Sequence, residues 1–565
     1  MMITAKNIQR SLFLCGCTLF FVNLETHAQK AAAQQKDSVI QGQTIQITQI
    51  YQPEIRQPQK PALIPVLPPP DTSKPKFQYV VPQQTLSYTY HSIPIRPLAL
   101  GKQESETTFQ NYAKAGIGNL TSIYLDAGLG SIKGDHYQTA FHLSHLNQKG
   151  KLSNQQSGFT DFTGSGNYYA SGHDFSAKLN VRNRRHRFYG YDDDTYQYGG
   201  SAIQQSLTDG SLTLGARNIE KNSLNIDYQP EIGFGLLGDN FSAKESRFTF
   251  NLPAQWHFGQ MPSDSIPYSP YGKISLGAYG NLVRLDNAGK STGNNLIKIN
   301  PAVDVTIENA RIHFGLSPAF GRNSKAWLLP DINVRAGLLN NHLTAFAGWK
   351  SDVAQNTYLD LSLINPFIDN IFDVQQSETD QAFAGFNSTA GKFVTFGATL
   401  SWRQWSNLPL FINDYAENPD GKRFQVIYSP RVQAFNIDAF IRYQPSEIIA
   451  LSAQGSWYNF YKTTLDQAWG YPSLKMEGLI EVHPMKKLQA HAGFSLLNGI
   501  YALDNAGHSK ALPGIFDVHA AAEYNIIPRF SVFLQANNIL NNKYQRWNQY
   551  QVYGLNIIGG FRFKF

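Results

Sequence analysis

Apolar and polar residues alternate in long runs over most of this 565-residue chain. Clear examples are FNIDAFIRYQ (435–444), IALSAQGSWY (449–458), FDVHAAAEY (516–524) and FSVFLQAN (530–537). Because successive side chains of a strand point to opposite faces, each run predicts a strand with one apolar face. Runs of about ten residues are long for a globular strand but match a tilted strand that crosses a bilayer.

The connections between these runs predict how the strands are arranged. Short connections alternate with long ones, as periplasmic turns and extracellular loops do in outer-membrane barrels. The count reaches about 22 strands, an even number found in outer-membrane transporters, which places the start of the first strand and the end of the last on the periplasmic side. The short connections are 171–174, 308–310, 339–342, 445–447, 484–487 and 526–529, and the long ones are 147–158, 184–206, 284–295, 351–380, 404–422, 461–472 and 498–512.

Tryptophan positions fit this arrangement. Trp349, Trp402, Trp457 and Trp547 fall near the outer strand ends and Trp256 near an inner one. Indole rings favour the interface between membrane and water, so we expect these side chains to mark the two edges of the bilayer.

The N-terminus indicates export. Lys6 and Arg10 precede an apolar run (11–22), and Ala28 supplies a small residue for cleavage, so residues 1–28 are predicted to be a signal peptide. The run LCGC (14–17) leaves lipoprotein processing as an alternative. Both cysteines of the chain, Cys15 and Cys17, lie in this segment, so the mature chain would have neither disulfides nor thiolate metal ligands. No later stretch is long and apolar enough for a membrane helix, which leaves a soluble β protein or a barrel in the bacterial outer membrane.

Residues 29–106 differ in composition from the rest. The stretch 51–82 is rich in proline, which removes amide donors and favours extended chain. We therefore predict three regions: the signal peptide (1–28), an extended proline-rich segment in the periplasm or the lumen (29–106), and an all-β, antiparallel transmembrane barrel (107–565).

The last seven residues, GGFRFKF, continue the alternation to the end of the chain. Phe561, Phe563 and Phe565 would face lipid, while Arg562 and Lys564 would face the interior. A terminal aromatic residue after alternating apolar residues resembles the signal that barrel-assembly machinery reads in outer-membrane proteins. We expect the three phenylalanines to serve in insertion.

The last 55 residues contain a distinctive set of features: Asn537, Asn538, Asn541, Tyr544 and Gly554, together with Trp547, Tyr550 and the terminal GGFRFKF. In these features they resemble the end of TonB-dependent receptor barrels. The resemblance implies a 22-strand barrel and energised uptake through a plugged lumen. Members of that family carry a globular plug of well over a hundred residues, whereas only about 78 proline-rich residues precede the first strand here. The lumen would then be filled by residues 29–106 and inward-folded loops, be plugged by a separate protein, or be open.

One stretch near the mature N-terminus suggests a coupling role. In QTIQITQIY (43–51) two isoleucines alternate with polar residues, a pattern that can add a strand to a periplasmic partner. The resemblance would make this segment a TonB box; the alternative is an extended linker. The residues concerned are Thr44, Ile45, Gln46, Ile47 and Thr48.

Composition narrows the remaining functions. Charged residues make up 16% of the chain and aromatic residues 13%, which suits many short strands and disfavours disorder and helical bundles. The cations behind the net charge of +7 are scattered and mostly single, and no long basic helix is evident, so we expect no nucleic-acid partner. The cluster RNRRHR (182–187) with Asp192–Asp194 is either a solvated loop or a contact for lipopolysaccharide phosphates or a charged ligand.

Sites for chemistry are not evident. His142 and His145 are three apart, which in a strand sends them to opposite faces and argues against a shared metal. There is no phosphate-binding loop and no nucleophile elbow, so we predict no enzyme activity, no cofactor and no metal. Three hypotheses remain. The first is a transporter of TonB-dependent type with a reduced N-terminus, and the second is a non-enzymatic barrel subunit of an envelope assembly or export complex whose N-terminal arm binds a periplasmic partner. The third, a barrel enzyme, ranks lowest because no residue pattern indicates one.

Overall fold

The computed structural model describes residues 111–220, 222–259, 271–287, 289–339, 342–369 and 373–565. The chain divides into two units, 1–99 and 100–565, and all described residues belong to the second. The predicted signal peptide, the proline-rich segment and the strand Thr44–Thr48 lie outside the described residues.

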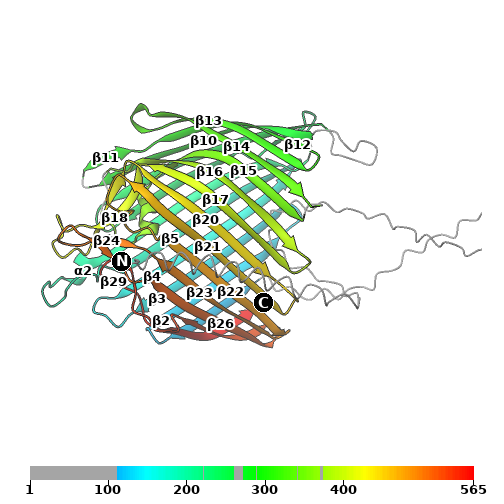
Figure 1. The fold of residues 1–565 in the computed structure, drawn as a ribbon. Coiled ribbons are helices and arrows are strands. Elements are labelled where there is room, and N and C mark those ends of the chain that lie inside the picture. Colours follow the sequence, from blue (N-terminus) through cyan, green and yellow to red (C-terminus); the bar gives the residue numbers. More distant parts are fainter. Residues whose placement is uncertain (1–110, 221, 260–270, 288, 340–341, 370–372) are drawn as a thin grey trace, which may run out of the picture. The chain divides into compact units, whose positions relative to one another are not determined.

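The described residues form a closed antiparallel barrel of 22 strands, which confirms the predicted fold and strand count (Figure 1). The ring closes where β1 pairs with β30, with Tyr112 opposite Lys564 and Gly118 opposite Ile558. The barrel strands are β1 (Tyr112–Gly118), β2 (Ser122–Lys133), β3 (Tyr137–Lys149), β4 (Gln156–Ala170), β5 (His173–Arg187), β6 (Gln204–Asn218), β8 (Glu231–Asp239), β9 (Lys244–Phe258), β10 (Tyr271–Asn287), β12 (Leu296–Ile307), β13 (Ala310–Phe320), β14 (Ala326–Leu338), β15 (Leu343–Gln355), β16 (Gln376–Ala390), β17 (Val394–Ser406), β20 (Val432–Tyr443), β21 (Ile449–Thr463), β22 (Leu474–Met485), β23 (Leu488–Asn498), β26 (Ile515–Ile527), β27 (Phe530–Asn537) and β30 (Asn556–Lys564).

Short strands, hairpins and helices extend the barrel strands or lie in their connections. β7 (Ile226–Tyr228) pairs with β9, and β11 (Lys290–Gly293) pairs with the end of β10, so the sheet has 24 strands in all. Three hairpins lie in connections: β18 (Leu408–Asn413) with β19 (Phe424–Ser429), β24 (Tyr501–Leu503) with β25 (Ser509–Ala511), and β28 (Gln545–Trp547) with β29 (Tyr550–Gln551). The helices among the described residues are α2 (Gly200–Ile203), α3 (Tyr358–Ile364) and the 3-10 turn η1 (Arg322–Ser324). No helix among the described residues is long and apolar enough to span a membrane.

The two faces of the wall differ as the alternation predicts. Apolar side chains that point outward remain exposed in the isolated chain, among them Ile117 (75%), Leu236 (69%) and Leu328 (62%). Many inward-pointing residues are polar and paired; for example, Arg217 forms an ion pair of 2.8 Å with the buried Asp174. Such a wall is stable where lipid covers its outside, since that much exposed apolar surface is costly in water.

Long connections gather at one end of the barrel, which we call the loop end, and short ones at the other, the turn end (Figure 1). All six predicted short connections lie at the turn end. The turn at Ser171 and Gly172 has positive φ at both residues (50° and 75°), the conformation that tight two-residue hairpins require. Alternation of length is incomplete, because connections 119–121 and 240–243 at the loop end are short and connection 219–230 at the turn end is long.

Candidate functional site

The loops at the loop end pack against one another instead of extending separately. Side chains from loops 188–203, 356–375, 407–431 and 538–555 share one hydrophobic core with residues at the ends of the wall strands. We call these four loops the loop assembly. The buried members of its core are Leu207, Leu237, Ala243, Leu285, Tyr358, Leu359, Leu361, Ile368, Val374, Phe411, Phe424, Trp547 and Tyr550.

Three aromatic rings mark the point where the loops meet. Phe367 stacks on Tyr550 with ring centroids 3.5 Å apart and an angle of 18° between the ring planes. Tyr189 packs edge-on against both, at 4.9 Å from Tyr550 and 5.9 Å from Phe367. We call Tyr189, Phe367 and Tyr550 the three-ring cluster.

The three rings come from loops rooted in separate sectors of the barrel. Loop 188–203 joins β5 to β6, loop 356–375 joins β15 to β16, and loop 538–555 joins β27 to β30. On the shorter path around the ring, six strands lie between the roots of loops 188–203 and 356–375, and six lie between the roots of loops 356–375 and 538–555. The four strands β1–β4 lie between the roots of loops 538–555 and 188–203. With neighbouring strands about 5 Å apart, each gap spans roughly 25 Å or more of the rim. Loops so far apart at their roots touch because they extend across the mouth of the barrel.

Loop 538–555 makes contacts with most of the other loops. The main-chain oxygen of Gln551 accepts hydrogen bonds of 2.8 Å from the Tyr189 hydroxyl and from the Gln155 amide. On the other side, Arg546 donates to the main-chain oxygen of Gly470 at 2.8 Å, and Asn548 donates to Asn413 at 3.0 Å. This loop therefore holds the others together.

The family-like residues lie at the base of the same loop. The Asn538 amide donates to the main-chain oxygens of Asn542 and Tyr553, both at 2.9 Å. The Asn541 side chain accepts from the main-chain N–H of Leu555 at 3.0 Å, and a Cβ at Gly554 would come within 2.5 Å of that same oxygen.

Two further family-like residues complete the base. Asn537 pairs with Asn556 across β27 and β30. The Tyr544 hydroxyl donates to the Asp517 carboxylate. All five residues thus fix where the loop leaves the wall, a structural role that the sequence did not reveal.

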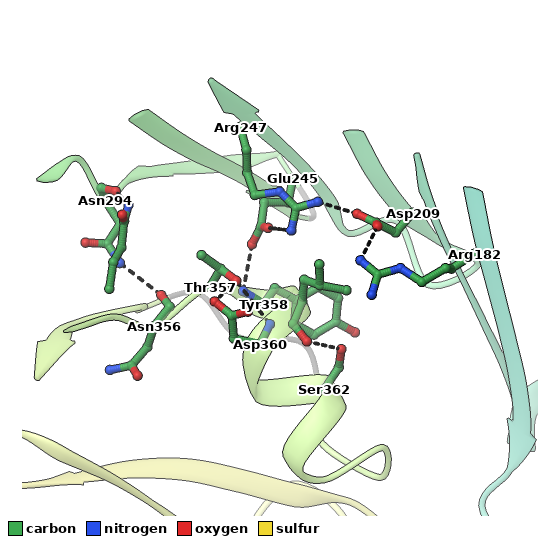
Figure 2. A network of polar contacts seen from close by, with 12 residues as sticks. Arg182, Asp209, Glu245, Arg247, Asn294, Asn356, Thr357, Tyr358, Asp360 and Ser362 are labelled. Carbon is green, nitrogen blue, oxygen red and sulfur yellow. Dashed lines mark hydrogen bonds and ion pairs between the residues drawn. The ribbon is translucent and has the colours of Figure 1, made fainter. Parts of the chain in front are cut away.

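Helix α3 anchors loop 356–375 to the inner wall (Figure 2). Thr357 caps the helix by accepting from the main-chain N–H of Asp360 at 3.0 Å, as a side chain at this position commonly does. The main-chain N–H of Tyr358 donates to Glu245 on β9 at 2.6 Å. Arg247 then connects Glu245 to Asp209 on β6, and Asp209 also pairs with Arg182 on β5 at 2.7 Å.

Tyr358 carries the second anchor. Its side chain is fully buried, and its hydroxyl donates to Asp239 at 3.0 Å and accepts from Gln205 at 2.8 Å. Burial raises the pKa of Tyr358 well above its usual value, so the hydroxyl keeps its proton and remains a donor to the carboxylate.

The inner wall beside this anchor is hollowed and polar. A cavity of about 770 Å³ is lined by strands β6 to β15. Most of its charges are paired: Lys298 contacts Asp352 at 2.6 Å, and Lys350 contacts Asp331 at 3.3 Å. A balanced wall of this kind offers hydrogen bonds without attracting one sign of charge.

The remaining predicted residues are placed as follows. Phe561, Phe563 and Phe565 point outward and are about half exposed, while Arg562 points inward to Glu523 at 3.5 Å. Their role in insertion stays a prediction.

The two histidines lie on opposite faces, as expected. His142 contacts Asp126 at 3.1 Å, whereas His145 contacts Thr160 at 2.8 Å. Among the described residues no group of three or more His, Cys, Asp or Glu side chains is arranged to hold a metal.

Sequence reasoning missed the loop assembly. Trp547 was expected at the membrane interface, yet it is 6% exposed and packs against Phe411 and Phe424 in the core. By contrast, Trp349 is 52% exposed on the outer face of the wall. One signal could have distinguished them: Trp547 and Tyr550 stand in a stretch without alternation, where aromatic residues have no lipid face to occupy.

No protein-family model matches the sequence, and no curated protein is significantly similar to it. Solved structures do match. The siderophore receptor PiuA from Acinetobacter baumannii is 9% identical, with a TM-score of 0.59, over 80% of this chain and 82% of the receptor. The pyoverdine outer-membrane receptor FpvA from Pseudomonas aeruginosa is 8% identical, with a TM-score of 0.58, over 81% and 78%. The FrpB iron transporter from Neisseria meningitidis is 10% identical, with a TM-score of 0.58, over 80% and 81%.

These matches establish the fold. The chain has the 22-strand barrel of TonB-dependent receptors, an outer-membrane type of barrel, as the C-terminal resemblance implied. The similar structures are receptors and transporters rather than enzymes.

Proposed function

We propose that the protein is an outer-membrane transporter of TonB-dependent type, in which the loop assembly closes the outer mouth and residues 29–106 act as a reduced plug. The observation that carries this proposal is the three-ring cluster, in which loops from three sectors meet over a wide, polar-walled barrel. A structural barrel subunit has no need of a closed mouth. A transporter needs one that opens, because an unfilled lumen of 22 strands would leak.

The orientation follows from the lengths of the connections. The loop end faces the outside and the turn end the periplasm, as in other outer-membrane barrels. Both ends of the barrel sequence, at β1 and β30, lie at the turn end, so residues 29–106 are delivered to the periplasm or to the lumen. There Thr44–Thr48 add a strand to the energising protein TonB.

Site-specific photo-crosslinking in cells tests the coupling. A photoreactive amino acid at Ile45 is expected to crosslink to TonB, whereas the same group at Val66, in the proline-rich run, serves as the matched control. Capture of TonB from Ile45 and not from Val66 supports transport. Reproducible capture of a different envelope protein from Ile45 would instead support the assembly-subunit hypothesis and overturn this proposal.

Planar-bilayer conductance tests the plug. A mature chain that lacks residues 29–106 is expected to conduct several times more current than the full mature chain, because a 22-strand lumen is wide when empty. The folded state of both chains is compared by their migration in unheated gels. Equal conductance of two folded chains would show that residues 29–106 do not fill the lumen.

A further inference from the structure

The outer surface of the wall carries a basic notch near the loop end of β3, β4 and β5. On β5 the outward residues Phe175, Leu179 and Val181 are exposed and apolar, and the same alternation places Arg185 outward. Arg185 stands four residues beyond Val181. At about 3.3 Å per residue on a tilted strand, its Cα lies roughly 10 Å past the last apolar residue.

The notch exists because a glycine stands between two polar side chains. Gly158 on β4 pairs with Asn147 on β3 and with Arg185 on β5. Having no side chain, Gly158 leaves a space over which Asn147 leans: a Cβ there would lie 3.1 Å from the Asn147 oxygen. A cavity of about 80 Å³ at this place is lined by Asn147, Gln156, Ser157, Gly158, Arg185, His186, Arg187 and Gln204.

Two arginines at the notch, Arg185 and Arg187, have N–H groups that form no ion pair with a carboxylate of the described residues. Arg185 is exposed, and within the described part of the chain no carboxylate forms an ion pair with it. The Nε of Arg187 is buried without a hydrogen-bond partner, while its Nη1 reaches only Asn154 at 3.4 Å. An exposed guanidinium such as that of Arg185, without a carboxylate partner, can donate to a phosphate oxygen without breaking an existing ion pair.

We propose that this notch binds a phosphate group of a phosphorylated lipid in the outer leaflet. Guanidinium groups bind phosphate through parallel N–H···O bonds, and the amides of Asn147 and Gln156 supply further donors. Arg185 lies beyond the outward apolar residues of β5, at the level where lipid headgroups lie. The inference rests on the proposed function only in its orientation, with the loop end outside; it is independent of transport.

Binding of lipid to the purified full chain in detergent tests the site, with native mass spectrometry as the readout. The probes are bis-phosphorylated lipid A, the same lipid after dephosphorylation, and inorganic phosphate. We expect the phosphorylated lipid to bind, the dephosphorylated lipid to bind at least about tenfold more weakly, and inorganic phosphate to compete only at high concentration.

Neighbouring arginines provide matched variants. Arg185→Gln removes the outward guanidinium and is expected to weaken binding of the phosphorylated lipid about tenfold. Arg184→Gln, one position earlier and on the inner face, is expected to bind like the unaltered protein. Equal binding by the two variants overturns the proposal. Strong binding of inorganic phosphate alone would assign the notch to a free anion instead of a lipid.

The orientation is tested separately. A single cysteine introduced by His508→Cys, whose side chain is 78% exposed in loop 499–514, should react with a membrane-impermeant maleimide on intact cells. Lipid binding in detergent without labelling on cells would overturn the orientation and with it the assignment to the outer leaflet. Labelling without lipid binding would overturn the notch alone.

Discussion

The wall and the loop assembly use the same aromatic residues in opposite ways. In the wall, rings such as Trp349 and Phe563 point outward and stay about half exposed. In the loop assembly, Trp547 and Tyr550 are buried among residues that lie more than a hundred positions away in sequence. Lipid can cover the first group, whereas only other parts of the same chain cover the second.

The two regions are also stabilised differently. The wall is a ring of main-chain hydrogen bonds that closes on itself, so no strand edge is left unpaired. The loop assembly depends on ring packing and on side chains that bond to the main chain, as Arg546 does to Gly470. We therefore expect substitutions in the assembly to release the loops while the wall stays closed.

The largest effect is expected at the seam of the wall. Gly560 faces Gly116 where β30 meets β1, and a Cβ at Gly560 would lie 2.0 Å from the main-chain oxygen of Ala115. Gly560→Ala should therefore prevent normal closure and sharply reduce the folded barrel. Migration in unheated gels, where folded barrels run faster than boiled ones, measures the folded fraction.

The adjacent glycine gives the matched control. At Gly559 the nearest atom to a new Cβ would be the Leu534 side chain at 3.6 Å, an ordinary contact. Gly559→Ala should fold like the unaltered protein. If both alanine variants folded equally well, close approach at the seam would not be required for closure.

A smaller effect, confined to the assembly, is expected from Tyr550→Ala. The variant leaves a cavity between Phe367 and Tyr189 and loses the bond from its hydroxyl to the main-chain oxygen of Lys422. Loss of a buried aromatic side chain costs about 3–5 kcal/mol, and here that loss lowers the stability of the packed loops. Limited proteolysis should cut loop 538–555 much faster, while gel migration of the barrel is unchanged.

Leu540→Ala is the control within the same loop, because Leu540 is 50% exposed. It should leave the rate of cleavage nearly as it was. Unfolding of the whole barrel by Tyr550→Ala would contradict the separation of wall and assembly.

The wall could be predicted from sequence because its rule is local. A period of two residues identifies a strand and its faces, and turn residues such as Ser171 and Gly172 mark its ends. The strand count follows because each strand pairs with its neighbours in chain order. Alternation holds to Phe565, so the final strand and its outward phenylalanines were also predictable.

The loop assembly could not be predicted, since its contacts join distant segments that have no period. Nothing near Tyr358 in sequence indicates Glu245 or Gln205, more than a hundred residues earlier. The family resemblance located Asn538 and Asn541 but not their role, which depends on main-chain groups brought together only by the folded loop. Trp547 was misplaced because the residue type alone does not say whether lipid or protein covers it.

The smallest effect is expected from removing the hydroxyl group of Tyr358 or of Tyr189, which anchor different parts of the loop assembly. Tyr358→Phe removes the hydroxyl that bonds Asp239 and Gln205, at a cost of about 1–3 kcal/mol, and Tyr189→Phe removes the bond to Gln551. Hydrogen–deuterium exchange should therefore become faster at 357–364 in the first variant and at 545–553 in the second. Each variant serves as the control for the other, since both lose one buried hydroxyl. If either substitution accelerated exchange equally in both segments, the loops would open as one cooperative unit, and the separate anchors on the inner wall and on loop 538–555 would not act independently.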